Sequence, residues 1–216
     1  MDKKYQIISR NLTKQDLDQV AKIHQQAFPD SLLTAFGFDA IKKYYHWQMT
    51  PPNNCYSVGV FQDNELLGFS FSGVLNNAEL FFIKEYFPYF FRHVFKHPKL
   101  LFDKRIFNQL KKSMGYVKEY ISKKQPLKAD DERLKEKSFG ILSTAVAPDH
   151  QGRGIGKLLT ENIEIYARDN DYPSIKMSVH NDNEASIKLH EKLGYKKVAS
   201  ENGNWHGVMV KELKKK

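Results

Sequence analysis

The sequence of 216 residues predicts a mixed α/β fold of the α+β type. Short β-type runs recur along the chain, and stretches with apolar residues at helical spacing lie between them. A glycine-rich turn joins one such run, Phe139–Val146, to a helical run that reaches about Asn170. The composition, 41% hydrophobic and 13% aromatic, is that of a chain that folds around a core.

The N-terminal part predicts a strand followed by two helices. Residues 5–9 alternate enough for an edge strand. Thr13, with Asp16 in the capping-box position, predicts the start of a helix that ends before Pro29. A second helix is expected from about Phe38 to the Pro-Pro break that follows it.

A hairpin follows these helices. Its strands are residues 56–61 and Glu65–Gly73, and Asp63-Asn64 supplies the turn. The single cysteine, Cys55, precedes the first of these strands and is expected to be a small buried hydrophobe. One cysteine excludes a disulfide within the chain and fits a reducing cytoplasm.

About sixty residues, 79–138, separate the hairpin from the next predicted strand, which is too many for a bare loop. Their apolar spacing predicts a helical insertion. It holds fifteen Lys or Arg and eight Asp or Glu, so most of the chain's formal charge of +9 lies there. Three roles stay open: a roof that offers cations to an anionic acceptor, a basic aromatic surface that touches a membrane, and a homodimer contact.

Two other roles for the insertion are weaker. Nucleic acid binding is not expected, because the basic residues accompany no recognisable binding motif. His93 and His97 stand four residues apart, a spacing that suits a metal, but no Glu follows the first and Pro98 follows the second. We therefore predict no metal site.

No run approaches the roughly twenty apolar residues of a membrane span, and no signal segment follows Met1, so we expect a cytoplasmic protein.

The glycine-rich turn is the first candidate site. It carries Gly152, Gly154 and Gly156 just before a helix, where N–H groups without partners and partial positive charge favour phosphate. The P-loop pattern fails because Leu158 follows Gly156-Lys157 and Gln151 holds the place of the first glycine. The dinucleotide pattern fails on glycine spacing and on the short length of chain that remains.

A third pattern fits this turn. Val146-x-Pro148 followed by Gln151-x-x-Gly154-x-Gly156 resembles the acetyl-coenzyme A pyrophosphate loop of the Gcn5-related N-acetyltransferase (GNAT) superfamily. About thirty residues later, the segment from Asn183 to Tyr195 is similar to the fifth-strand and fourth-helix region of the same enzymes. The two matches lie in the family order and cover residues 139–198.

The resemblance implies one GNAT-like domain over residues 1–216, with the insertion at about 79–138. It implies a mostly antiparallel sheet with splayed parallel fourth and fifth strands and helices on both faces. The implied cofactor is acetyl-CoA. The residues that the resemblance assigns to it are Ser143, Thr144, Ala145, Val146, Ala147, Gln151, Gly152, Arg153, Gly154, Ile155, Gly156, Lys157, Asn183 and Ser186.

The resemblance also implies chemistry. The backbone of Val146 would donate to the thioester oxygen. The family's tyrosine, often the acid that protonates the departing thiolate, is His190 here. His190 is therefore either a general acid or only a helix residue beside the thioester, with solvent supplying the proton. The predicted fourth strand contains no acid, so a base would come from elsewhere; the candidates are His24, Asp30, His46 and His206.

The acceptor would be a primary amine of a small molecule, such as an amino sugar or a nucleotide-linked sugar. The segment after the first helix would supply the acceptor wall. Its candidate residues are Phe28, Asp30, Phe36, Tyr44, Tyr45, His46 and Trp47. Two alternatives stay open: acetylation of protein or peptide amines, and a coenzyme A-binding module without catalysis.

Overall fold

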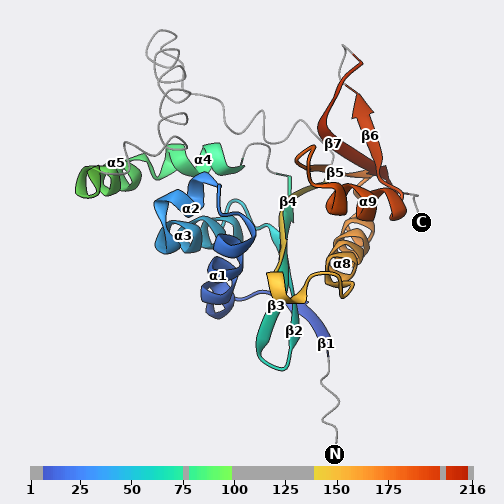
Figure 1. Ribbon diagram of the computed structural model, residues 1–216, viewed down its shortest axis with the longest axis horizontal. Helices are drawn as coiled ribbons and strands as arrows, with labels where there is room; N and C mark the ends of the chain where they lie inside the picture. Colours follow the sequence, from blue (N-terminus) through green and yellow to red (C-terminus); the bar gives the residue numbers. More distant parts are fainter. Residues whose placement is uncertain (1–6, 75–77, 99–138, 200–202, 214–216) are drawn as a thin grey trace, which may run out of the picture.

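The computed structural model describes residues 7–74, 78–98, 139–199 and 203–213 (Figure 1). Within these residues, seven strands form one sheet in the order β1-β2-β3-β4-β5-β7-β6. The strands are β1 (Ile7–Asn11), β2 (Tyr56–Gln62), β3 (Glu65–Gly73), β4 (Phe139–Val146), β5 (Ser174–Ser178), β6 (Lys196–Ala199) and β7 (Trp205–Glu212). Neighbouring strands are antiparallel except β4 and β5, which are parallel. The predicted fold class is confirmed.

Helices cover both faces of the sheet (Figure 1). One face carries the first three helices, and the other carries α8 with α9 beside it. The helices are α1 (Leu17–Ala27), α2 (Leu32–Phe36), α3 (Phe38–Met49), α4 (Ala78–Glu85), α5 (Phe87–Lys96), α8 (Ile155–Asp169) and α9 (Glu184–Lys192), with short 3-10 turns at Lys14–Asp16 and Pro148–His150.

The predicted cap is present at the start of the 3-10 turn that leads into α1. The Asp16 carboxylate accepts hydrogen bonds from the Thr13 N–H at 2.7 Å and the Thr13 hydroxyl at 2.9 Å. It also forms an ion pair with Arg10 at 2.7 Å. The Arg10 hydrogen bond is the main cause of the lowered pKa of Asp16. The cap thus ties the end of β1 to the first helix.

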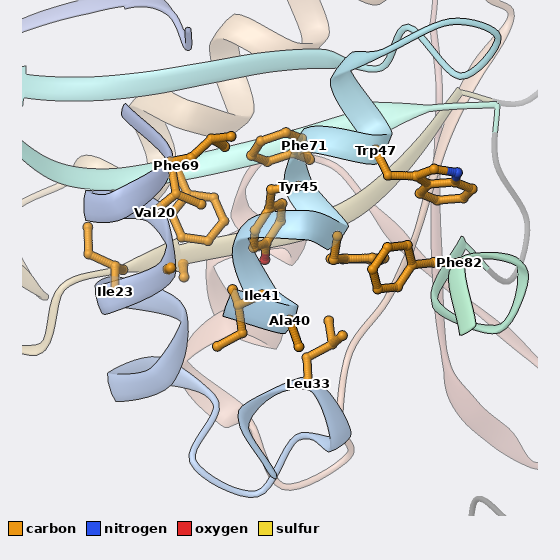
Figure 2. Close-up of a cluster of buried hydrophobic side chains, with 14 of the residues drawn as sticks. Val20, Ile23, Leu33, Ala40, Ile41, Tyr45, Trp47, Phe69, Phe71 and Phe82 are labelled. Atoms are coloured by element: carbon orange, nitrogen blue, oxygen red, sulfur yellow. The ribbon is translucent and has the colours of Figure 1, made fainter. Parts of the chain in front are cut away.

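The largest core lies between the sheet and the helices of the first face. Figure 2 shows Phe69 and Phe71 of β3 above Tyr45 of α3, which is fully buried. The Tyr45 ring lies 5.2 Å from that of Phe69 and 4.5 Å from that of Phe71. On the opposite face, Val58 and Val60 of β2 pack against α8. Strands β2 and β3 therefore contribute side chains to a core on each side of the sheet.

Helices α4 and α5 extend the first core. The Phe82 ring of α4 lies 5.6 Å from Trp47 (Figure 2), and the Phe90 ring of α5 lies 4.5 Å from Phe36. The Trp47 indole N–H donates to Glu85 at 2.8 Å. The first part of the predicted insertion is thus helical and packs on the body, whereas residues 99–138 lie outside the described residues.

Two details differ from the sequence prediction. Helix α2 occupies residues 32–36, between the two helices predicted from the sequence, where no helix was predicted; its N-cap is Ser31, whose hydroxyl accepts from the Thr34 N–H at 3.0 Å. The first strand runs to Asn11, two residues further than expected, and its predicted start lies outside the described residues. Cys55 is buried as predicted, and burial raises the pKa of its thiol to about 12.

Candidate active site

The site begins where β4 and β5 separate. The parallel ladder between them pairs only Phe139, Gly140 and Ile141 with residues 175–177, yet β4 continues to Val146. Along residues 142–146, the backbone N–H and C=O groups on the edge of β4 that faces β5 therefore form no ladder with β5 and can bond to another partner. A cavity of about 740 Å³ lies along this edge.

Strand alternation shows which of these groups face the cavity. The Ala147 N–H donates to the Leu67 carbonyl of β3 at 2.9 Å. Because successive backbone groups point to opposite sides of a strand, the N–H and carbonyl of Val146 point away from β3. The Gln151 side chain donates to that carbonyl at 3.2 Å. The Val146 N–H is thus directed toward the open edge.

The glycine-rich turn closes one end of the cavity. Gly152 and Gly154 have φ angles of +75° and +80°, which glycine adopts without strain. Helix α8 starts directly after Gly154 and has no side-chain cap. Its first N–H groups, at Gly154, Ile155, Gly156 and Lys157, therefore have no partner within the helix. These donors and the partial positive charge of the helix end fit a pyrophosphate.

Helix α9 forms another part of the cavity wall, beside α8. Asn183 caps this helix by accepting from the Ser186 N–H at 3.1 Å. Asn183, Ser186, Leu189 and His190 all line the cavity. The capping oxygen is engaged, so the amide nitrogen of Asn183 is the group of this side chain that is suited to a ligand's carbonyl or phosphate oxygen.

His190 is buried between α9 and α8. Its Nδ1 lies 2.8 Å from the Ser186 carbonyl oxygen, so this nitrogen carries the proton and donates. Its Nε2 lies 3.4 Å from the Thr160 hydroxyl, which itself donates to the Gly156 carbonyl. Burial lowers the pKa of His190, opposed by the Ser186 bond and by Glu164. At neutral pH the ring is therefore mainly uncharged.

His24 stands at the other end of the cavity, in a chain of hydrogen bonds. The chain ends at the Phe28 carbonyl, which accepts from the Thr34 hydroxyl at 2.7 Å. The Thr34 hydroxyl in turn accepts from the Ser31 hydroxyl at 2.9 Å. Since the Ser31 proton is used there, the His24 Nε2, 3.1 Å away, must donate to Ser31. The His24 Nδ1 then accepts from the Tyr45 hydroxyl at 2.8 Å.

Both ring nitrogens of His24 are therefore engaged. The side chain is 4% exposed, and burial lowers its pKa to about 4. A neutral imidazole with both nitrogens bonded is a poor proton acceptor. It is, however, suited to holding the loop between α1 and α2 in place beside the cavity.

The described lining of the cavity is short of charge. It contains four histidines, at positions 24, 150, 180 and 190, and one lysine, Lys157, but no Asp or Glu. The lining joins a turn fit for pyrophosphate to a partly apolar wall from the first three helices. This arrangement can hold a phosphate-bearing cofactor and a second molecule end to end.

Residues 17–195 match the family model described as Acetyltransferase (GNAT) family. The chain belongs to this family. Its cofactor is acetyl-CoA, and the donor set at the glycine-rich turn fits the pyrophosphate of that molecule. The resemblance seen in the two sequence motifs is thereby confirmed.

Curated relatives of this GNAT chain match over short segments. Human N-acetyltransferase 8B is 32% identical over 72 residues, 33% of this chain and 32% of that protein. Mycothiol acetyltransferase of Rhodococcus jostii is 32% identical over 76 residues, 35% of this chain and 24% of that protein. The matched segment thus spans a third or less of the length of each relative.

Solved structures share the fold over most of the chain. The ribosomal-protein-S18-alanine N-acetyltransferase of Escherichia coli has a TM-score of 0.56 at 13% identity, covering 96% of this chain and 94% of that one. A PaiA N-acetyltransferase of Thermoplasma acidophilum in complex with coenzyme A has a TM-score of 0.53 at 12% identity, covering 96% and 99%. At these identities the likeness shows the GNAT fold alone.

The structure brings most of the predicted cofactor residues together. Those that line the cavity are Ser143, Thr144, Ala145, Val146, Gln151, Gly152, Gly154, Ile155, Gly156, Lys157, Asn183 and Ser186. Ala147 and Arg153 do not line it. The Ala147 N–H is bonded to β3, and Arg153 is exposed, with its guanidinium 3.3 Å from the His150 Nδ1.

The predicted acceptor residues are divided. Phe28 and Tyr44 line the cavity, but Asp30, Phe36, Tyr45, His46 and Trp47 do not. Asp30 is exposed, and Phe36, Tyr45 and Trp47 are buried in the core beneath the wall. Of the base candidates, His24 alone lines the cavity, and His206 is exposed on β7.

Several lining residues were not singled out from the sequence. They are Ala27, Ser31 and Leu33 on the acceptor side, His150 beside the glycine-rich turn, and Ile141, Leu142, Met177, Ser178, Val179, His180, Ala185 and Leu189 along the splayed strands and α9. One signal was available: Ser31-x-x-Thr34 is an N-cap pattern. That pattern predicts a short helix, which carries Leu33 into the acceptor wall. No Lys or Arg from the described part of the insertion lines the cavity.

Proposed function

We propose that this protein transfers the acetyl group of acetyl-CoA to a primary amine of a small molecule, by direct attack within a ternary complex. The observation that carries the proposal is one continuous cavity. It runs from the glycine-rich turn, along the open edge of β4, to the wall built by α1, α2 and α3. A cofactor and an amine can therefore meet beside Val146 without leaving the protein.

The backbone supplies the binding and the polarisation. The N–H groups of Gly154, Ile155, Gly156 and Lys157 would hold the pyrophosphate, and the amide of Asn183 would contact the cofactor arm. The Val146 N–H would donate to the acetyl carbonyl oxygen, where negative charge develops as the amine attacks. Bound acetyl-CoA supplies the activated thioester.

Proton transfer would rely on solvent. The amine nitrogen forms the new C–N bond and gives up a proton, while the sulfur of the broken C–S bond takes one up. No carboxylate lines the described cavity, and His24 has both nitrogens engaged. His190 is mainly neutral and donates to a carbonyl. Orientation alone reaches effective molarities of about 10⁵ M or more, so a dedicated base is not required.

The acceptor end favours a small amine with an apolar or ring portion. Phe28, Leu33 and Tyr44 supply apolar surface, and Ser31 supplies a polar group at the same end. Concave sites that combine apolar walls with few polar groups are typical of small-molecule binding. Amino sugars and nucleotide-linked amino sugars are the first compounds to try, followed by amino acids and polyamines.

The test is release of the coenzyme A thiol with a panel of these amines and of peptides with free amino groups. We expect saturable turnover with a small amine and none with peptides. Phe28→Ala should raise KM for the amine and leave the Kd of acetyl-CoA unchanged. The matched control is Phe38→Ala on α3, because Phe38 is exposed and does not line the cavity.

Other outcomes overturn the proposal in distinct ways. Turnover with peptides alone would identify a protein acetyltransferase. Binding of acetyl-CoA with no turnover on any amine would identify a binding module without catalysis.

A further inference from the structure

Helix α5 carries an exposed row of phenylalanines. Phe87, Phe91 and Phe95 are 48%, 64% and 80% exposed. They follow one another at intervals of four residues, so they lie on one side of the helix within less than a quarter of its circumference. We name this row the α5 phenylalanine stripe. Among the described residues, only one other phenylalanine, Phe38, is classed as exposed.

The stripe is held outward by the opposite side of the helix. Phe90 is buried against Phe36 and Phe82, and Tyr89 packs on Phe90. His93 packs in turn on Tyr89 and Phe36. These contacts fix the rotation of α5 about its axis, so the stripe stays on the side of the helix that faces away from the core. In Figure 1, α5 lies at the outer edge of the molecule, on the side away from β6 and β7. A broad surface can therefore reach it.

Positive charge borders the stripe. Arg92 and Lys96 are exposed and continue round the helix from the phenylalanines. Lys43 of α3 lies over the Tyr89 ring, at 5.2 Å, on the packed side. Residues 86–98 contain no Asp or Glu. The charge of Asp39 on α3 acts on Tyr89 and His93, on the packed side of the helix.

We propose that the α5 phenylalanine stripe, with Arg92 and Lys96, docks the protein onto an anionic lipid bilayer. Aromatic side chains beside basic ones are the composition of helices that lie in the membrane interface, where the rings enter the headgroup boundary and the cations meet anionic lipid. Among the described residues, no helix has the length and hydrophobicity of a membrane span.

Charge argues against a second copy of the chain as the occupant. A twofold contact through the stripe would bring Arg92 and Lys96 near their own copies, with no acid on this helix to offset them. The whole chain carries a formal charge of +9 and repels itself at a distance. An anionic surface turns the same charges into attraction.

The test is co-sedimentation of the full chain with vesicles of phosphatidylcholine alone and of phosphatidylcholine with phosphatidylglycerol. We expect binding to the anionic vesicles only. Phe91→Asp, at an exposed position, should reduce that binding at least tenfold. Arg92→Glu combined with Lys96→Glu should abolish the preference for anionic lipid. The matched control is Ile165→Asp on α8, an exposed apolar residue on the other face of the sheet, which should bind as the wild type does.

Size-exclusion chromatography and thermal unfolding of the same variants distinguish the other occupants. A wild-type dimer that Phe91→Asp converts to a monomer, with no vesicle binding, would show a contact between copies and overturn the proposal. Absent vesicle binding with a lower Tm for Phe91→Asp would show that another part of the chain covers the stripe, which also overturns it. Equal binding by Phe91→Asp and Ile165→Asp would mean that lipid attraction is not located on α5.

Discussion

Replacement of His24 by Asn should change how the stability of the protein depends on pH. Burial lowers the pKa of His24 to about 4, whereas an unfolded chain has a histidine pKa of about 6.5. As the pH falls below 6.5, His24 therefore becomes protonated in the unfolded chain but stays neutral in the native chain until the pH approaches 4. Native stability contributed by the neutral ring is complete above pH 6.5 and is lost progressively between about pH 6.5 and 4.

The magnitude follows from the two pKa values. Each pKa unit corresponds to about 1.4 kcal/mol, so the full loss below pH 4 is about 3 kcal/mol. Between pH 7.5 and pH 5 the loss is about 2 kcal/mol. Asn at position 24 cannot titrate. At pH 7.5 the variant is less stable than the wild type, because it loses the bonds to Tyr45 and Ser31. The difference in free energy of unfolding between the two proteins should be about 2 kcal/mol smaller at pH 5.

Urea unfolding of both proteins at the two pH values measures this gap. Other titrating groups are shared by the two proteins and cancel in the comparison. His24→Gln provides a second variant without the ring and should show the same narrowing. If the difference in unfolding free energy between wild type and variant stays constant from pH 7.5 to pH 5, His24 is protonated equally in the native and unfolded chains, and its pKa is not lowered by folding.

Three further changes test other parts of the account. His190→Gln should keep at least a tenth of the wild-type kcat, with the Kd for acetyl-CoA unchanged. The ring proton is used in the bond to the Ser186 carbonyl, so we do not expect it to protonate the thiolate. A hundredfold loss of kcat would instead support a general-acid role. Glu164→Gln should lower the free energy of unfolding in urea by about 2–4 kcal/mol, because the buried carboxylate pairs with Lys211 at 2.6 Å and with Arg168 at 2.8 Å. The control is Glu184→Gln at an exposed ion pair; an equal or larger loss of stability in the control would contradict this prediction. Gly207→Ala should lower the free energy of unfolding by at least about 1 kcal/mol more than Gly203→Ala does. Both glycines have positive φ, but only at Gly207 would an added Cβ overlap the Val179 carbonyl. Equal Tm values for the two variants would exclude this overlap.

Residue patterns with local causes were predictable from the sequence. The capping interaction of Thr13 and Asp16, the hairpin turn at Asp63 and the strand-to-helix turn at Gly154 each depend on residues a few positions apart. The cofactor end of the cavity depends on such a turn and on one strand. Most residues that line this end of the cavity were therefore named from the sequence, and their contact with the cofactor stays a prediction.

The acceptor end depends on contacts between distant residues. Tyr45 and Phe28 are both aromatic residues near α1 and α3, yet Tyr45 points into the core and Phe28 reaches the cavity. Helical spacing indicates a face but not which neighbour covers it. The role of His24 depends on Tyr45, twenty-one residues away, and on the proton order set by the Phe28 carbonyl. The sequence alone could not supply that order.

The most direct test of the account is calorimetric titration of acetyl-CoA into the wild type, Gly154→Trp and Gly203→Trp. Both glycines have positive φ, at +80° and +76°, and neither has an atom within 4 Å of an added Cβ, so the two variants carry similar backbone strain. Only Gly154 lies at the turn that faces the cavity. We expect micromolar binding by the wild type and Gly203→Trp, and no detectable binding by Gly154→Trp. Binding by Gly154→Trp equal to that of the wild type would contradict the assignment of the turn as the pyrophosphate site.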